Sequence, residues 1–513
     1  MNTTIFTTLS VLLTLCAVVQ SYNILGIFPL AMRSHFQMFE TIMKELARQG
    51  HTVTVISCFS QKNVVKNYRD ISLESNQATV VDLPSENWSL YNEFFIILEY
   101  AGHNLCENEL RSRAFQEFLK TDEKFDLIII ELFTSECFMG LAHKFKAPII
   151  GITTRTVMYW DNIKFGNPSN PAYISNNMLT TGPRKSFLER LETTLVNEIH
   201  QYFHDYYVNV KNQKMAEEVF GTDLPLLSDI SQNISLLFTN SHCSITPSVP
   251  LVPGIIEIAG AHIGSVKKLP EHIEMWINES NHGVVYFSMG SLIRADSLSE
   301  KRRDMFINAF RRIPQRVLLK WENDSIPDKP DNVMIEKWMP QFDILSHPNV
   351  KAFVTHGGMF GVSEAFHCGV PMIIIPMFGD QYENAESVEQ NGGGIYLSYE
   401  NLSEEAIYDA LTTVLDPKFN MKAKELSVRF KDRPLPPLKT VNYWIEYVIR
   451  HKGASHLKTA AVRMPLYKYL LLDVVAFLLL VMLIFMFFVY YVTKTVLRIL
   501  PRRLSCSAKL KKN

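Results

Sequence analysis

Short, nearly continuous apolar runs recur along the chain, each followed by a turn and then by apolar residues at helical spacing. Near the N-terminus, residues 22–29 and 52–56 form two runs of this kind. One helix face is predicted between them, on the apolar residues Phe36, Phe39, Ile42, Met43 and Leu46. Ser34 and Gln37 have the spacing of a capping box at the start of this helix, and Gly50 can end it. The pattern predicts the strand–helix–strand unit of a parallel sheet.

The second half of the chain repeats this alternation. Its predicted strands are the apolar runs 284–287, 317–320, 350–355 and 372–375. The third run is followed by a helical stretch that Gly369 can end. The fourth is followed by Asp380 and Glu383, which have capping-box spacing for a helix to about Gln390. Two such groups predict two doubly wound α/β domains, which bind ligands at the carboxyl ends of their strands.

The two ends of the chain carry longer apolar segments. Residues 1–21 resemble a secretory signal peptide, with a sequence compatible with cleavage before Tyr22. Val474–Val492 is an unbroken apolar run long enough to cross a membrane, and we place a transmembrane helix at 467–492. Residues 493–513 form a basic tail. Because a signal peptide precedes the span, the body is predicted to be lumenal and the tail cytosolic.

Two further features agree with a lumenal body. The chain has five Asn-x-Ser sequons, at Asn87, Asn233, Asn278, Asn323 and Asn401. Lys509 and Lys511 lie near the C-terminus in a pattern that resembles a receptor-read retrieval signal for the endoplasmic reticulum. We therefore expect a single-pass type I protein of the endoplasmic reticulum membrane.

Composition narrows the classes of function. The chain has 513 residues, too many for one core, and 47% of them are hydrophobic. Its formal net charge of -1 argues against a nucleic-acid partner. None of the seven cysteines forms a Cys-x-x-Cys pair and no metal-ligand cluster is recognised, so no zinc or redox site is indicated. The sequence assigns no disulfide and leaves association into a homo-oligomer open.

The stretch Trp338–Gln381 contains most of the candidate chemistry. Within it His356, Gly357 and Gly358 follow the predicted strand 350–355 and precede a helix. Glycines let backbone N–H groups approach a phosphate, and the positive end of a helix favours an anion there. Because a lone His-Gly-Gly turn is more often an ordinary tight turn, the neighbouring residues decide between the two interpretations.

The whole of Trp338–Gln381 resembles the donor-binding segment of the membrane-bound animal UDP-glycosyltransferases. The resemblance implies that Trp338 stacks on uracil, that Gln341 lies alongside the nucleoside, and that Glu364 accepts from the ribose hydroxyls. It assigns His356, Gly357, Gly358, Phe360 and Gly361 to the diphosphate. It assigns Asp380 and Gln381 to the sugar hydroxyls.

The likeness continues on both sides of this stretch. The turn after the run 284–287 resembles a family loop that touches the diphosphate, which adds Ser291. Tyr443–Leu457 resembles the last lumenal segment of the animal enzymes, which in that fold crosses back to brace the N-terminal domain. The chain departs from the plant relatives at one contact to the phosphate. Where plant relatives have Trp-Asn-Ser after the glycine pair, this chain has residues 359–361, Met-Phe-Gly, so the backbone must replace a contact from the Asn side chain.

A second group of candidate residues lies far upstream. His35 is predicted at the first position of the helix after the first strand, and Glu131 follows a strand at 125–130. Position alone leaves open a surface histidine and a surface or N-cap glutamate. The positive helix end favours a neutral imidazole, and a parallel sheet can bring Glu131 close enough to orient it. The resemblance implies a catalytic histidine here and an acid, Asp in the relatives, at position 131.

The same resemblance implies the GT-B fold: two doubly wound, Rossmann-like α/β domains facing a crevice, plus the C-terminal transmembrane helix. Between the signal peptide and that helix we expect an acceptor-binding domain, a linker, a UDP-sugar-binding domain and a segment crossing back to the first domain, at residues 22–250, 251–275, 276–432 and 433–466. Aromatic residues of the first domain are predicted to be mostly core, with some lining an acceptor pocket beside the loop 166–183: Trp88, Tyr91, Phe94, Phe95, Tyr159, Trp160, Phe165 and Tyr173.

The expected reaction is inverting transfer of a sugar from a UDP-sugar, glucose being usual in the invertebrate branch, to a hydroxyl of a small lipophilic acceptor. The UDP-sugar is a co-substrate, and neither a cofactor nor a metal is expected. Two alternatives remain: a GT-B protein that carries a lipophilic ligand without catalysis, and a UDP-sugar epimerase. A carrier has no need of His35 with Glu131. UDP release with and without acceptor distinguishes the epimerase.

Overall fold

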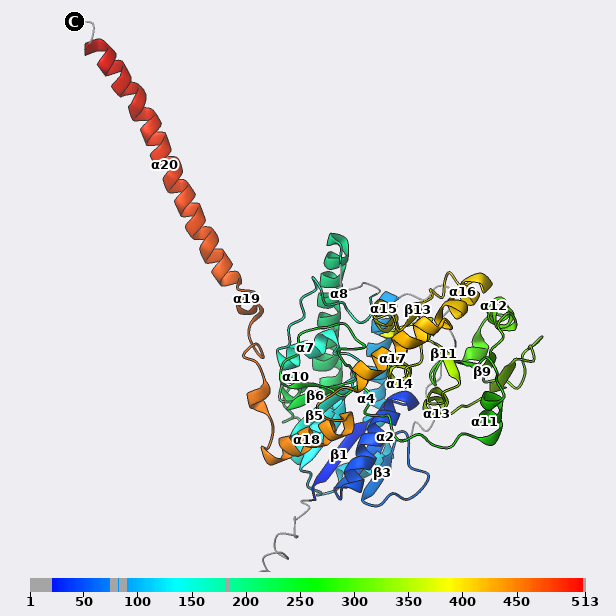
Figure 1. Cartoon of the computed structure of the whole chain (residues 1–513). Helices are drawn as coiled ribbons and strands as arrows, with labels where there is room; N and C mark the ends of the chain where they lie inside the picture. The colour runs from blue at the N-terminus through cyan, green and yellow to red at the C-terminus, as the bar shows by residue number, and fades with distance from the viewer. Residues whose placement is uncertain (1–20, 74–81, 83–89, 180–184, 511–513) are drawn as a thin grey trace, which may run out of the picture. The chain divides into compact units, whose positions relative to one another are not determined.

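The computed structural model describes residues 21–73, 82, 90–179 and 185–510, in two compact units divided after Thr459. The predicted signal peptide up to residue 20, Asn87, Trp88 and the last residues of the tail lie outside the described residues. The first unit contains two sheets in which every strand pairing is parallel (Figure 1). Two parallel sheets, each covered by helices, confirm the predicted α/β class.

The first sheet has the strand order β3-β2-β1-β4-β5-β6-β7. Its strands are β1 (Asn23–Phe28), β2 (Thr52–Ser57), β3 (Tyr68–Ser72), β4 (Leu127–Glu131), β5 (Ile149–Thr153), β6 (Leu236–Thr239) and β7 (Ile255–Glu257). Because β7 pairs with β6, the first sheet extends into the range 251–275 that was expected to be a linker.

The second sheet has the order β10-β9-β8-β11-β12-β13. Its strands are β8 (Val284–Ser288), β9 (Arg316–Lys320), β10 (Val333–Glu336), β11 (Val350–Thr355), β12 (Met372–Ile374) and β13 (Gly394–Tyr396). In both sheets the strand order reverses beside the first strand, between β1 and β4 and between β8 and β11. Such reversals are where open parallel sheets bind ligands.

Helices connect the strands. Those of the first domain are α2 (Arg33–Arg48), α3 (Leu90–Ile96), α4 (Leu105–Leu110), α5 (Arg113–Leu119), α6 (Gly140–Phe145), α7 (Tyr159–Phe165), α8 (Phe187–Tyr206), α9 (Gln213–Phe220) and α10 (Leu227–Ser231), with the π-helices η1 (Ile97–Asn104) and η3 (Tyr207–Asn212) and the 3₁₀ turn η2 (Glu136–Met139). Those that follow are α11 (Glu271–Asn278), α12 (Glu300–Arg311), α13 (Gln341–Leu345), α14 (Met359–Cys368), α15 (Gln381–Gln390), α16 (Glu404–Val414), α17 (Pro417–Lys431), α18 (Pro437–Arg450), α19 (Leu466–Tyr469) and α20 (Leu472–Leu510), with the 3₁₀ turns η4 (Ala295–Ser297) and η5 (Ser455–Leu457).

The start of α2 differs from the prediction. The helix begins at Arg33 after Met32, whose side chain makes no capping hydrogen bond, so Ser34 is not the N-cap. His35 consequently lies at the third helical position instead of the first, still within the first turn. The predicted buried face is confirmed, since Phe36, Phe39, Ile42, Met43 and Leu46 are all buried.

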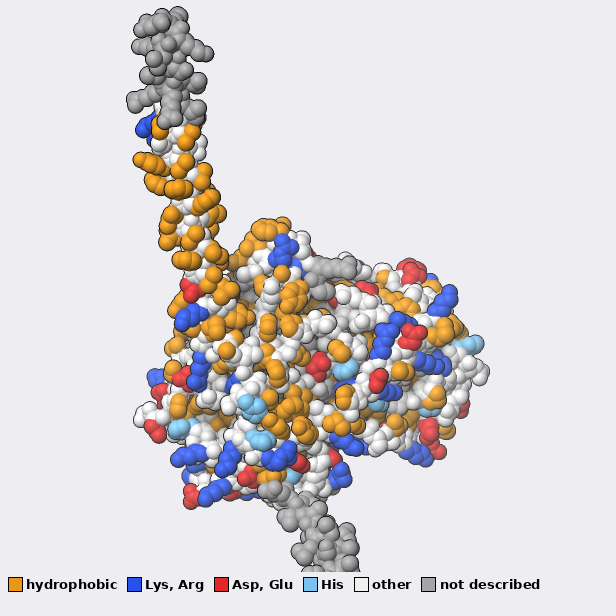
Figure 2. Space-filling view, turned by 60° about the vertical axis from the view of Figure 1, so that its left-hand side comes forward, with side chains coloured by type: hydrophobic (Ala, Val, Ile, Leu, Met, Phe, Trp, Pro, Cys, Tyr) orange, Lys and Arg blue, Asp and Glu red, His pale blue; other side chains and the backbone are white. Residues whose placement is uncertain are grey.

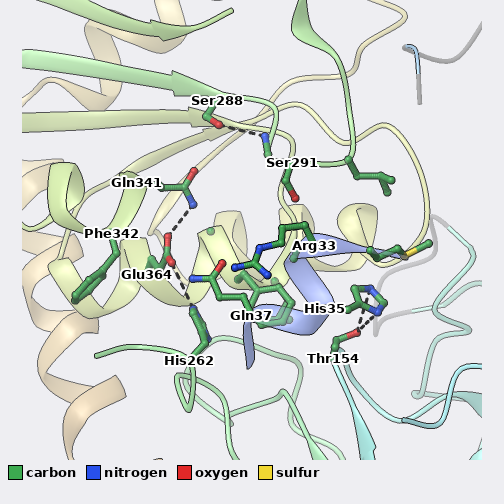
Figure 3. Close-up of a pocket in the computed structure, with 18 of the residues that line it drawn as sticks. Arg33, His35, Gln37, Thr154, His262, Ser288, Ser291, Gln341, Phe342 and Glu364 are labelled. Atoms are coloured by element: carbon green, nitrogen blue, oxygen red, sulfur yellow. Dashed lines mark hydrogen bonds and ion pairs between the residues drawn. The ribbon is translucent and has the colours of Figure 1, made fainter. Parts of the chain in front are cut away.

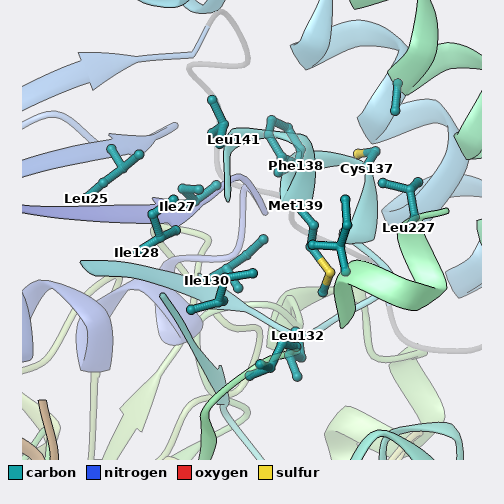
Figure 4. Close-up of a cluster of buried hydrophobic side chains, with 14 of the residues drawn as sticks. Leu25, Ile27, Ile128, Ile130, Leu132, Cys137, Phe138, Met139, Leu141 and Leu227 are labelled. Carbon is teal, nitrogen blue, oxygen red and sulfur yellow. The ribbon is translucent and has the colours of Figure 1, made fainter. Parts of the chain in front are cut away.

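Alternate residues of the first sheet enter different hydrophobic clusters. Leu25 and Ile130 pack in one cluster with Phe138 and Leu227 (Figure 4), whereas Ile24 and its neighbours pack in another with helices α2 and α18. Both faces of the sheet are therefore buried, which explains why its strands are continuous apolar runs. A disulfide that the sequence did not assign, Cys106–Cys137 with Cα atoms 6.1 Å apart, joins α4 to η2.

The segment after the second domain packs against the first. Val441, Ile445 and Val448 of α18 are buried in the same cluster as β1, β2 and α2. This contact is the one that the resemblance implied for Tyr443–Leu457.

The second unit contains α20, whose residues Leu472–Ile499 form the candidate membrane span, with a mean hydropathy of 3.0. The helix begins at Leu472, not at 467. Leu471 has a positive φ of 54°, which separates α20 from the short helix α19.

Candidate active site

One large cavity opens where the carboxyl ends of the two sheets face each other (Figure 3). Its volume is about 1100 Å³, and residues of both domains line it. The lining includes most of the predicted site residues: His35, Ser291, Trp338, Gln341, His356, Gly358, Phe360, Gly361, Glu364, Asp380 and Gln381. Residues more than 300 positions apart in the chain are thus brought to one place by the two strand reversals.

The first-domain side of the cavity is organised around His35. Its Nδ1 lies 2.7 Å from Oε1 of Glu131, the last residue of β4, and the imidazole remains partly accessible while the carboxylate is buried. Strands β1 and β4 are neighbours, so the turn after β1 and the end of β4 meet at the sheet edge. The predicted pairing of these two side chains is present, and the carboxylate fixes the ring orientation.

Three residues that were not recognised from the sequence surround this pair. The Thr154 hydroxyl lies 3.3 Å from Nδ1 and 3.2 Å from Nε2 of His35. The Phe133 ring meets the imidazole edge-on, with centroids 5.4 Å apart. The guanidinium of Arg155 lies 4.2 Å from the centroid of Phe133, so aromatic and cationic groups together limit the movement of the ring.

The second-domain side is organised around His356, directly after β11. A Cβ on Gly290 would lie 2.6 Å from Cε1 of this ring, and one on Gly358 would lie 2.6 Å from Nε2. Glycine is therefore required on both sides of the imidazole. Desolvation by the surrounding protein, reinforced by Lys320, lowers the pKa of His356 to about 4, so the ring is neutral at neutral pH.

The backbone around His356 supplies further donors. Gly358 is the N-cap of α14, which makes the amides of Phe360 and Gly361 part of its first turn, where N–H groups have no partner within the helix. Ser291 follows Gly290, whose φ is 79° and whose N–H donates to Ser288 Oγ at 3.2 Å. Ser291 and the first turn of α14 face the same cavity, an arrangement suited to an anion.

The side of the cavity lined by Trp338 and Glu364 has one exposed and one buried part. Trp338 is 65% exposed in the cavity wall, which leaves a ring face accessible. Glu364 is buried, accepts a hydrogen bond of 2.7 Å from Gln341 Nε2, and lies 3.6 Å from His262 Nε2. Two side chains thus orient the carboxylate toward the cavity, and His262 is another residue that the sequence did not indicate.

The loop before α15 carries Asp380 and Gln381. The Gln381 Oε1 accepts from the N–H groups of Met377 and Phe378 at 2.8 and 3.2 Å, which leaves its amide N–H groups for a ligand. The predicted capping box is not formed, because Glu383 instead accepts from Thr156 and Asn177 of the other domain, at 3.2 and 3.1 Å. Burial raises the pKa of Glu383 to about 7.

A second carboxyl group reaches the same loop from the first domain. Glu93 of α3 is buried and accepts from the Gly379 N–H at 3.1 Å. Burial raises the pKa of Glu93 to about 7 despite this hydrogen bond and the nearby Arg155. Glu93 and Glu383 both make hydrogen bonds between the two domains, beside Asp380. No sequence pattern around either residue predicted these contacts.

The aromatic residues predicted to line an acceptor pocket do not line the large cavity. Phe94, Trp160 and Phe165 are buried core residues, as expected for most of the aromatic set, and none of the described aromatic candidates lines the large cavity. The described part of the loop 166–183 does not line it either. The apolar wall comes from Phe133 and from the junction of α3 and η1, at Ile96, Ile97, Tyr100 and Ala101.

Comparison with known proteins agrees with this geometry. Residues 24–505 match the model of the family described as "UDP-glucoronosyl and UDP-glucosyl transferase". A "UDP-glycosyltransferase UGT5" from Dactylopius coccus is 40% identical, over 94% of this chain and 93% of its own. A "UDP-glucosyltransferase 2" from the same insect is 38% identical over 96% of both chains. The human "UDP-glucuronosyltransferase 2B15" is 29% identical over 87% of this chain and 88% of its own.

Solved structures share the fold at lower identity. The spinosyn forosaminyltransferase SpnP superposes with a TM-score of 0.57 and 18% identity, covering 84% of this chain and all of the other. A glycosyltransferase of kitacinnamycin gives a TM-score of 0.58 and 17% identity, with the same coverage. These neighbours and the two parallel sheets show the GT-B fold.

Proposed function

Because the chain belongs to the UDP-glucoronosyl and UDP-glucosyl transferase family, and is therefore a UDP-glycosyltransferase, we propose that it transfers glucose from UDP-glucose to a hydroxyl of a small lipophilic acceptor, with inversion at the anomeric carbon. The observation that carries this proposal is the His35–Glu131 pair at 2.7 Å, open to the cavity that also contains the nucleotide segment. Base and donor site thus face one volume, as a single displacement requires.

On the acceptor side, His35 acts as the general base. Glu131 holds Nδ1–H, which leaves the lone pair of Nε2 for the proton of the acceptor hydroxyl. As that proton moves to Nε2, the imidazole becomes positive beside the Glu131 carboxylate, which stabilises the charge. The acceptor oxygen forms its bond to the anomeric carbon from the face opposite the diphosphate.

On the donor side, the bond between the anomeric carbon and the diphosphate oxygen breaks, and its electron pair leaves with UDP. Ser291, the neutral His356 and the first-turn amides of α14 are placed to donate hydrogen bonds to that oxyanion. Trp338 offers a face for uracil and Glu364 a carboxylate for the ribose. Asp380 and Gln381 accept and donate to the sugar hydroxyls. The proposed step uses no cofactor.

Glucose is proposed as the sugar because of the relatives. One insect relative that covers nearly the whole chain is described as a UDP-glucosyltransferase and is 38% identical, whereas relatives described as glucuronosyltransferases are 28–31% identical. The acceptor is proposed to be lipophilic because Phe133, Ile96, Ile97 and Tyr100 line its side of the cavity.

A direct test is to incubate full-length protein in microsomes with one phenolic acceptor and a set of UDP-sugars. We expect UDP release that requires acceptor, is fastest with UDP-glucose, and yields a β-linked product from the α-linked donor. UDP-sugar isomerised without UDP release would support the epimerase. Acceptor binding without turnover of any UDP-sugar would support the carrier.

We also propose that α20 anchors the chain in the endoplasmic reticulum membrane with the body in the lumen. Support comes from the apolar span Leu472–Ile499 and from the sequence of both chain ends. The asparagines of four predicted sequons, Asn233, Asn278, Asn323 and Asn401, are exposed. We expect the full chain to carry glycans of the type found in the endoplasmic reticulum. After removal of residues 509–513, we expect processed glycans. Unprocessed glycans after that deletion would contradict the retrieval signal.

A further inference from the structure

Helix α8 buries a mostly polar face and exposes an apolar face, the reverse of the usual arrangement. The residues that it buries are mostly polar: Thr193, Asn197, His200 and His204, with Val196. Asn197 accepts a hydrogen bond of 2.8 Å from Asn176, and His204 Nε2 lies 3.1 Å from the buried carboxylate of Glu136. The inner face is therefore held by polar contacts, whereas a helix on a water-soluble protein buries its apolar stripe.

The outer face of α8 is apolar. Leu188, Leu191, Leu195, Ile199, Tyr202 and Tyr206 recur every three or four residues and are between 43% and 71% exposed. In Figure 2 apolar side chains gather at the top of the body, the height that α8 reaches in Figure 1. A row this long differs from the single apolar residues that are scattered over ordinary surfaces, and such rows mark contact with another apolar phase.

Helix α3 and η1 extend this surface. Phe95 of α3 packs edge-on against Phe203 of α8, with ring centroids 5.0 Å apart, so the two helices are neighbours. Beside the contact Tyr91, Ile96 and Tyr100 are 53%, 38% and 69% exposed. We call the exposed apolar residues of α8, α3 and η1 the outer apolar face.

The acidic residues at its edges are restrained by tyrosines. The Tyr91 hydroxyl donates to Glu192, and the Tyr159 hydroxyl donates to Glu198 at 3.0 Å. Tyrosine, with an apolar ring and a polar tip, is suited to the boundary between lipid and water. The edge carries more acid than base, so the face matches a neutral lipid surface better than an anionic one.

The chain itself indicates which apolar phase is close. The body ends at Thr459, and the candidate span begins at Leu472. Even a fully extended linker of this length reaches about 40 Å. With the span in a bilayer, the body therefore always remains near lipid. This step depends on the membrane anchor proposed above.

We propose that the outer apolar face docks on the bilayer to which the chain is anchored, and that lipophilic acceptors enter the cavity from the lipid at this place. Ile96 and Tyr100 make the connection, because they line the cavity that contains His35 and follow Phe95, whose ring contacts α8, by one and five residues. An acceptor dissolved in lipid then passes from the bilayer to the catalytic base along an apolar wall.

The test measures lipid contact in the full chain. Leu195→Cys is labelled with bimane in a background in which the exposed Cys243, the partly buried Cys368 and the tail Cys506 are replaced by serine, Cys58 being buried. The matched control is Lys301→Cys on α12 of the other domain, an exposed position. Both proteins are reconstituted in phosphatidylcholine vesicles that contain nitroxide-labelled lipids, and flotation with the vesicles is recorded first.

We expect loss of fluorescence at position 195 and none at 301. Shallow nitroxides should quench more than deep ones, because a helix lying in the interface penetrates only about 5–10 Å. Flotation without quenching at 195 would overturn the docking alone. Protection of position 195 from aqueous iodide without lipid quenching would show that a second protein copy covers the face, and would also overturn it. Failure to float would overturn the anchor and the docking together, whatever the transferase activity.

A second measurement addresses acceptor entry. Leu195→Glu is compared with Leu195→Met, which keeps the surface apolar. The glutamate variant should have a raised KM for an acceptor that partitions into lipid and an unchanged KM for a water-soluble phenol. Equal changes for both acceptors would overturn entry from the lipid.

Discussion

Each half of the active site places a histidine at the reversal of its strand order, on opposite sides of that reversal, and the surroundings of the two histidines differ. His35 follows the first strand of its sheet and His356 the neighbouring strand at the reversal of the other. His35 is partly accessible and lies 2.7 Å from a buried carboxylate. His356 lies between two glycines, and desolvation together with Lys320 lowers its pKa to about 4.

The difference shows that neighbours, and not the fold, set the chemistry of each histidine. A buried carboxylate beside His35 holds its Nδ1 and fixes the orientation of the ring. Desolvation and a lysine near His356 keep that ring neutral, so it can donate through an N–H without binding a proton itself. In the proposed mechanism, one fold repeated twice thus provides a base for the acceptor and a fixed donor for the leaving group.

The largest effect is expected from His35→Ala. Loss of a general base typically costs about a hundred- to ten-thousand-fold in rate. Turnover of an aliphatic alcohol should fall by this amount while UDP binding, followed by thermal shift, stays nearly unchanged. A phenol that ionises at the assay pH needs the base less and should be affected less. Near-normal turnover of the alcohol would show that His35 is not the base.

Glu131→Gln tests the carboxylate behind the base. A hydrogen bond to a charged group contributes about 1.5–3 kcal/mol, so kcat should fall roughly 10- to 100-fold. The control is Glu131→Asp, which keeps the charge and matches the acid of the relatives, and it should recover most of the activity. If the glutamine variant had the same kcat as the aspartate variant, the charge of the carboxylate would have no role in catalysis.

Trp338→Ala should weaken the donor side alone. Stacking of a base on an aromatic ring is worth about 1–3 kcal/mol, so the KM for the UDP-sugar should rise roughly 5- to 100-fold. Glu364→Ala should act in the same direction, since it removes the carboxylate that Gln341 orients. The relative rates with different acceptors should not change. Altered acceptor preference with an unaltered donor KM would mean that the nucleotide site is misplaced.

His356→Gln should change how stability depends on pH. The ordinary pKa of 6.5 falls to about 4 in the folded protein, so between these values the unfolded chain binds a proton that the folded chain does not. Stability is therefore lost as the pH falls from about 6.5 to 4. Thermal unfolding of the wild type should decline more steeply over this range than that of the variant. Parallel curves would show that His356 is not held neutral.

The smallest effect on turnover is expected from truncation after Thr459. All residues of both halves of the active site lie before this point, in one compact unit. The released body should fold and retain its kcat with a water-soluble acceptor. An inactive but folded body would show that a residue of the second unit is needed for activity.

The grouping of residues on the second-domain side of the cavity was predictable because they are close together in the sequence. The stretch Trp338–Gln381 contains two strand–turn–helix units, so the turns at its strand ends could be identified one after the other. The pairing of His35 with Glu131 required a sheet in which β1 neighbours β4. The residues made this proximity possible, and the likeness to a family favoured it over the surface alternatives. Thr154, Arg155, Glu93 and His262 carry no local signal at all, because each meets the site through a neighbouring strand or the opposite domain.

Two predicted capping boxes are not formed, and in one of them a contact between domains replaces the cap. The Ser34 and Glu383 spacings both predicted capping boxes, but α2 begins one residue before Ser34, and Glu383 bonds to Thr156 and Asn177 instead. A cap contributes only about 1 kcal/mol, so a competing contact between domains can outweigh it. The disulfide between Cys106 and Cys137 likewise needed the packing of α4 on η2 before its partners could be named.

The sequence by itself determined the class of fold, the buried strands, the apolar span and the turns that line the second-domain side of the cavity, because periodicity and turn chemistry act over a few neighbouring positions. Tertiary structure alone decided which distant groups share the cavity, which histidine stays neutral, and that α8 turns its polar face inward. These properties depend on distances and desolvation between residues far apart in the chain, which no local pattern encodes.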